Sequence, residues 1–183
     1  MIEGKRVPET VYRVYADNIR KDRDKIHYLA TPMAYLFNMT LHSLWMQKVS
    51  IRMERVGPPD NLKWITYFTA NEVERNCPIT NQDEQKMLRL FTGRGGDEAG
   101  EVRINAKLGL VYRQVKKDTT EIFKRLGLEL APGTELKALR DLRIADLIIN
   151  QGVDYGYLMK YGLGKHHRHF DANLFKDEIR SYA

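Results

Sequence analysis

Apolar residues recur at helical spacing along most of this 183-residue chain, and the spacing changes to strict alternation after residue 48. Val49 and Ile51 begin an alternating run, the segment 57–61 is rich in turn formers, and 62–68 consists mostly of β-prone residues. Two β-prone runs joined by a turn predict a β-hairpin. We therefore expect a mainly α fold of the α+β kind, a helical domain with one β-hairpin at about 49–68.

The helical segments are bounded by residues that commonly begin or end helices. From the apolar spacing we expect helices over about 8–20, 33–47, 81–92, 101–126 and 135–151. Thr31 is expected to cap the second helix, which is apolar around its circumference and should therefore be buried. Gly127 and Gly152 should end the last two helices, because glycine takes the left-handed conformation without steric cost.

The glycine-rich run 93–100 is the best internal boundary in the chain. We expect an N-terminal part, 1–92, with helices and the hairpin, and a C-terminal helical part, 101–183, with a basic and aromatic tail, joined by this linker into one compact unit. A Walker-type phosphate loop needs lysine followed by serine or threonine, and residues 93–100 contain no lysine. A flexible connector is the favoured interpretation of this run.

The charge balance favours an anionic partner. Thirty basic and 24 acidic residues give a formal charge of +6, although the charges are interleaved along the chain. Cys77 is the only cysteine, which excludes an internal disulfide and a multi-thiolate metal site. No apolar run is long enough for a membrane helix, and no secretory signal is visible. We expect a protein that does not associate with membranes, located in the cytoplasm or within a viral particle.

The segment 142–163 has the composition of a helix-turn-helix. Leu147 and Ile148 precede Gly152 in the predicted turn, and Asp154 could cap a short second helix. A packing corner without nucleic acid is the alternative, because Gln151 stands where an apolar residue is expected and two glycines weaken the second helix. The residues expected to contact nucleic acid or another anion are Lys160, Lys165, His166, His167 and Arg168.

A histidine cluster follows this segment. His167, His169 and Asp171 have the spacing of a divalent-metal site on an extended segment. The string is similar to the first part of the metallo-β-lactamase signature, over five residues and without its final histidine. Only 12 residues follow Asp171, too few for the rest of that fold. A basic, pH-sensitive surface patch is the favoured interpretation, with these three residues as weak metal-ligand candidates.

Aromatic residues crowd the last part of the chain among lysines and arginines, a mixture typical of protein interfaces and of base stacking. The residues expected at a protein interface are Trp64 and Tyr67 in the hairpin and Tyr155, Tyr157, Phe170, Phe175 and Tyr182 in the C-terminal part.

The sequence contains no coherent catalytic motif, so we expect no catalytic residues and no cofactor. The leading hypothesis is a non-catalytic structural or adaptor subunit of a multi-protein assembly, such as a connector in a virus or bacteriophage particle. Its partners would be other protein subunits in a homo- or hetero-oligomer, with nucleic acid as a further partner. The alternative is a DNA-binding regulator or replication accessory protein that uses the segment 142–163. A metal-dependent hydrolase built on the histidine cluster is the third hypothesis.

Overall fold

The computed structural model describes residues 2–22, 25–38, 49–60, 63–70, 73–79, 82–91, 99–102 and 104–158. The helices are α1 (Val7–Lys21), the short 3-10 helix η1 (Ile26–Leu29), α2 (Ala30–Phe37), α4 (Gln82–Leu88), α5 (Leu108–Leu126), α6 (Glu135–Ile149) and α7 (Tyr155–Tyr157). The strands are β1 (Val49–Val56), β2 (Lys63–Ala70), β3 (Val73–Ile79) and β4 (Ala99–Val102). The mainly α fold class with a β-hairpin at 49–68 is confirmed.

The sheet is larger than the predicted hairpin. Its strand order is β3-β2-β1-β4, and each neighbouring pair is antiparallel. In β1–β2, Ile51 pairs with Phe68 and Arg52 pairs with Tyr67. Cys77 lies in β3 opposite Thr66 of β2. The strand β3 also contains a proline, which is tolerated because β3 lies at the edge of the described sheet.

Two predicted helices have different bounds in the structure. The helix expected over 33–47 begins at Ala30 and ends at Phe37, where Asn38 takes a left-handed conformation with φ of 51°; residues 39–48 lie outside the described part. Thr31 therefore lies inside α2 and does not cap it. The helix expected from residue 101 begins at Leu108, because the preceding residues 99–102 pair with β1 as β4.

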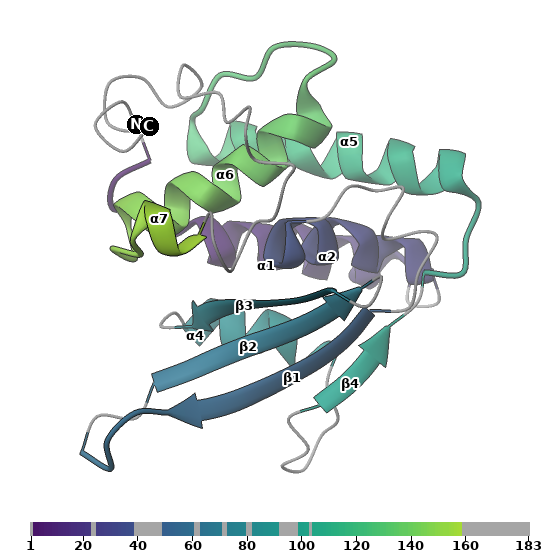
Figure 1. The fold of residues 1–183 in the computed structure, drawn as a ribbon. Coiled ribbons are helices and arrows are strands. Elements are labelled where there is room, and N and C mark those ends of the chain that lie inside the picture. Colours follow the sequence, from purple (N-terminus) through teal and green to yellow (C-terminus); the bar gives the residue numbers. More distant parts are fainter. Residues whose placement is uncertain are drawn as a thin grey trace.

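The helices α1, α2, α5 and α6 gather on one side of the sheet (Figure 1). Ile51 of β1 is 2% exposed and belongs to the same apolar cluster as residues of all four of these helices. This cluster joins side chains from both sides of the predicted linker, for example Phe37 of α2 and Phe123 of α5. Ala99 and Gly100, which we expected in the linker, belong to β4, and 92–98 lie outside the described residues.

Helix α5 has buried apolar residues at helical spacing and ends at a glycine. Val111, Val115 and Ile122 are buried at helical spacing, and they turn one side of α5 toward the core. Gly127 ends the helix with a φ of 67°, and the backbone N–H of Leu128 donates to the carbonyl of Phe123 at 2.9 Å. This is a Schellman-type ending, as the glycine predicts. Within the described residues, no helix has the length and apolar character needed to cross a bilayer.

Candidate nucleic-acid interface

The side of α5 that faces away from the core carries a row of cations, which we name the α5 basic stripe: Arg113, Lys116, Lys117 and Lys124. All four side chains are exposed. They recur three, four or seven residues apart with Thr120 between them, so they lie along one face of the helix. At 1.5 Å per residue, the stripe follows about 16 Å of the helix axis.

Helix α5 holds a large share of the positive charge of the chain. Its 19 residues include five basic and two acidic side chains, so its formal charge is +3 of the +6 of the whole chain. One of the two acids, Asp118, is buried beneath the surface. The other, Glu121, accepts a hydrogen bond from Arg125 Nε at 2.9 Å. The exposed face of α5 is therefore strongly basic.

The four stripe cations have no ion pair with a described residue, a property that they share with exposed Lys21 of α1. Within the ranges that the structure describes, no acidic side chain forms an ion pair with any of the four. By contrast, Arg125 on the same helix contacts Asp17 of α1 at 2.7 Å as well as Glu121. The hydrogen bond from Arg125 lowers the pKa of the Asp17 carboxyl, so this ion pair is fully charged at neutral pH. The charge of the stripe is not compensated in this way.

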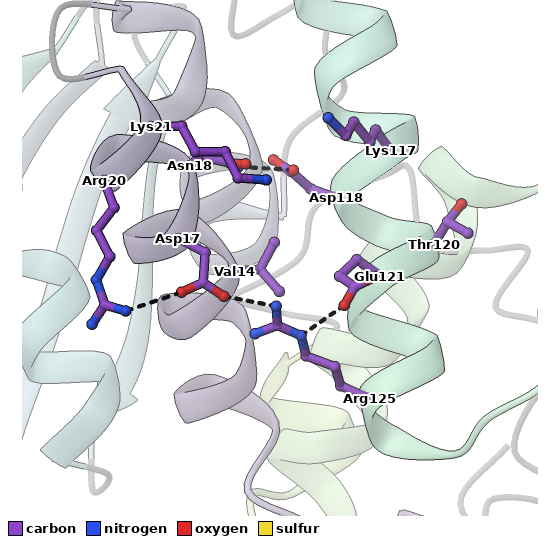
Figure 2. A pocket seen from close by; sticks show the side chains of 10 residues that line it. All are labelled: Val14, Asp17, Asn18, Arg20, Lys21, Lys117, Asp118, Thr120, Glu121 and Arg125. Carbon is purple, nitrogen blue, oxygen red and sulfur yellow. Dashed lines mark hydrogen bonds and ion pairs between the residues drawn. The ribbon is translucent and has the colours of Figure 1, made fainter.

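A groove of about 680 Å³ runs between α1 and α5 beside the stripe. Figure 2 shows its lining, with side chains of α1 on one wall and side chains of α5 on the other. Four cations line it, namely Arg20, Lys21, Lys117 and Arg125. Lys117 belongs both to the groove and to the stripe, so the two features meet at this residue, although the groove lining also includes the carboxylates of Asp17, Asp118 and Glu121.

The floor of the groove is set by Asp118, which is 2% exposed and joins three helices. Asn18 Nδ2 of α1 donates to its Oδ1 at 2.9 Å, and Gln114 Nε2 of α5 donates to the same oxygen at 2.8 Å. Thr31 Oγ1 of α2 donates to Oδ2 at 2.7 Å, which explains why this threonine does not cap its helix. Burial raises the pKa of the Asp118 carboxyl, while these three hydrogen bonds act in the opposite direction.

A second polar cluster is fully enclosed in the core. Arg143 of α6 forms an ion pair with Glu84 of α4, and its guanidinium lies 5.2 Å from the ring centroid of Tyr35 of α2. Tyr35 Oη donates to Asp146 Oδ2 of α6 at 3.3 Å. All four residues are at most 3% exposed. Because no ligand can reach these groups from solvent in this conformation, we assign the cluster to the packing of α2, α4 and α6.

The predicted helix-turn-helix segment is described as far as Leu158. Its first helix is α6, Gly152 takes a φ of 66°, and the N–H of Tyr157 donates to Asp154 Oδ1 at 2.8 Å, so the predicted cap is confirmed. Gln151, the polar residue at an expected apolar position, donates to Asp146 Oδ2 at 2.9 Å. Residues 159–163 of the segment lie outside the described residues, and its role in binding stays a prediction.

Four of the predicted contact residues lie on β2 and α7, and the others lie outside the described residues. Tyr67 of β2 is half-buried, and the guanidinium of Arg52 on β1 lies 4.2 Å from its ring centroid; Trp64 also belongs to β2. Tyr155 and Tyr157 are half-buried on α7. The remaining predicted site residues lie outside the described residues: Lys160, Lys165, His166, His167, Arg168, His169, Phe170, Asp171, Phe175 and Tyr182.

The metal hypothesis has no further support in the described part of the chain, where no three His, Cys, Asp or Glu side chains form a group that could hold an ion. Comparison of the chain with models of known protein families, with curated proteins and with solved structures finds no match.

The α5 basic stripe was missed by the sequence analysis. Its signal was present, because the cations at 113, 116, 117 and 124 share the face opposite the apolar residues of α5.

Proposed function

We propose that this protein is a non-catalytic nucleic-acid-binding protein, and that the exposed face of α5 contacts the phosphate backbone. The observation that carries the proposal is the α5 basic stripe, four exposed cations on one helix face without ion pairs to described residues. A basic row of this kind is the electrostatic footprint of phosphate binding. The proposal keeps the nucleic-acid hypothesis reached from the sequence and moves the contact surface to α5.

Electrostatics also favours a polyanion over a small acidic ligand. The stripe follows about 16 Å of helix axis, which is longer than a single carboxylate or phosphate. Repeated negative charge on a polymer can meet several of its cations at once, and each neutralised phosphate releases counterions. The binding we propose is therefore strongest at low salt and shows little dependence on base sequence.

The experiment is a fluorescence anisotropy titration of a labelled mixed-sequence DNA duplex, and of the matching RNA, at low salt. The test variant is Lys116→Gln with Lys124→Gln, and the matched control is Lys86→Gln with Arg89→Gln, which removes two exposed cations from the α4 region instead. We expect the stripe variant to lose about tenfold or more in affinity, at a few-fold per phosphate contact. Equal affinity of both variants, or no binding of the wild type at low salt, would contradict the proposal.

A structural or adaptor subunit of a multi-protein assembly stays a prediction. Among its predicted contact residues, Tyr67 lies on β2, and Tyr155 and Tyr157 lie on α7. These rings belong to separate elements, and the rest of the predicted contact set lies outside the described residues. Nucleic-acid binding is compatible with a place in a larger particle, so the anisotropy titration does not decide between a free protein and a subunit.

A further inference from the structure

The α1–α5 groove has two ends that differ in charge balance. At one end, Asp17 contacts Arg20 at 3.6 Å and Arg125 at 2.7 Å, and Arg125 also contacts Glu121. Two cations thus face two carboxylates (Figure 2), and this end is close to neutral. An anion gains little by binding there, because the guanidinium groups already have anionic partners.

At the other end, two lysines from different helices face the groove. Lys21 is the last residue of α1, and Lys117 is the stripe cation in the middle of α5. Both are exposed, and neither forms an ion pair with any residue in the described ranges. Figure 2 shows them on either side of the contact between Asn18 and Asp118. Both groove cations without an ion pair to a described residue are therefore at this end, where the carboxylates of Asp17 and Asp118 also act on them electrostatically.

The groove floor holds together the helix backbones that carry the two lysines. Asn18 lies one turn before Lys21 on α1, and Asp118 directly follows Lys117 on α5. Their 2.9 Å hydrogen bond is buried, and Thr31 of α2 donates a 2.7 Å hydrogen bond to the other oxygen of the same carboxylate. Both oxygens of Asp118 already accept hydrogen bonds from protein donors. The backbones that carry Lys21 and Lys117 are thus preorganised, which lowers the entropic cost of binding an anion between them.

We propose that the Lys21–Lys117 end of the groove binds one phosphate group of the nucleic acid that lies along α5. The nucleic acid then leaves the stripe at Lys117 and crosses to the C-terminal end of α1. Two ammonium groups from two helices provide rotatable donors and charge for the phosphate oxygens. This inference rests on the proposed function, since it takes the stripe as the main contact and adds a site on a second helix.

The test compares Lys21→Gln with Arg13→Gln in the anisotropy titration with the full chain. Arg13 is an exposed cation of the same helix, but it pairs with Glu9 at 2.7 Å and does not line the groove. We expect Lys21→Gln to weaken duplex binding several-fold at low salt. The ratio of wild-type affinity to Lys21→Gln affinity should fall by about threefold when the salt concentration is raised fourfold, because each phosphate contact contributes about 0.9 to the slope of log K against log salt concentration. Arg13→Gln should bind as the wild type does.

Several outcomes would overturn the inference and leave the proposed function intact. One is wild-type affinity of Lys21→Gln in a titration where the stripe variant Lys116→Gln with Lys124→Gln binds weakly. Another is an equal loss in Arg13→Gln, which would indicate a general charge effect. In a parallel NMR titration, inorganic phosphate and the duplex should both shift the amide resonances of Lys21 and Lys117. Shifts with inorganic phosphate but not with the duplex would assign the site to a free phosphate and overturn the inference.

Discussion

The buried carboxylate of Asp118 should make one of the larger single-residue contributions to the stability of this fold. Replacement of Asp118 by alanine removes the acceptor for three donors, Asn18 Nδ2, Thr31 Oγ1 and Gln114 Nε2. Thr31 is 1% exposed and Asn18 is 9% exposed, so both donors stay buried without their acceptor. Gln114 is half-buried, and its amide can turn to water.

The size of the effect follows from this difference in exposure. Each buried donor left without a partner costs about 1–3 kcal/mol. Two such donors give a loss of about 2–6 kcal/mol in the free energy of unfolding. The cost of burying the charged carboxylate, which raises its pKa, is relieved in the variant and favours the lower part of that range. Such a loss is a large fraction of the stability of a domain of this size.

Urea denaturation followed by circular dichroism measures this loss. Asp118→Asn keeps one acceptor oxygen and should lose less than Asp118→Ala. Thr120→Ala is the matched control on the same helix, because Thr120 is exposed and donates only to the carbonyl of Lys116, and it should change stability by less than about 0.5 kcal/mol. If Asp118→Ala destabilised the protein no more than this control, the network would not hold α1, α2 and α5 together.

Three further predictions concern the rest of the core. Asn150→Ala should free the N-terminal segment, because Asn150 Nδ2 donates to the carbonyl of Ile2 at 3.1 Å and Oδ1 accepts from the N–H of Gly4 at 2.8 Å. Limited proteolysis of this variant should cut near the N-terminus faster than in the wild type, and an unchanged rate of cleavage would refute the contact. Arg143→Ala leaves Glu84 buried without its ion-pair partner and should cost about 3–5 kcal/mol in urea unfolding, whereas a loss below about 1 kcal/mol would show that the pair is not buried in solution. Burial raises the pKa of Asp146 above its ordinary 3.8, so the folded state binds a proton more tightly than the unfolded state does. The free energy of unfolding should therefore increase as the pH falls from neutral through the raised pKa toward 3.8. Asp146→Asn should remove this increase from the pH profile of urea midpoints.

The sequence predicted the mainly helical class and the hairpin because both depend on local periodicity. The strands β3 and β4 were missed for physical reasons. Pro78 within β3 is acceptable only at a sheet edge, and the edge is a property of the assembled sheet. Strand β4 has four residues and begins with Ala99 and Gly100, which have low β propensity, so its conformation depends on pairing with β1.

The candidate site was predictable in part. The cations of the α5 basic stripe share a helix face in the sequence pattern, and their common exposure follows from the apolar residues opposite. The role of Thr31 could not be predicted, because its partner Asp118 lies 87 residues away in the chain. The same holds for the meeting of Lys21 and Lys117 across the groove, which depends on how α1 packs on α5. Local patterns indicate charge, whereas tertiary packing decides which charges stand together.

The most direct measurement of nucleic-acid binding by α5 is the salt dependence of duplex affinity. If the four stripe cations each neutralise one phosphate, the slope of log K against log salt concentration should be about −3 to −4 for the wild type. Replacement of Arg113, Lys116, Lys117 and Lys124 by glutamine should reduce the slope to about −1 or closer to zero, because Lys21 is then the one proposed contact left, while the circular dichroism spectrum stays unchanged. A wild type without salt-dependent binding, or a fourfold variant with the wild-type slope, would contradict a phosphate contact through α5.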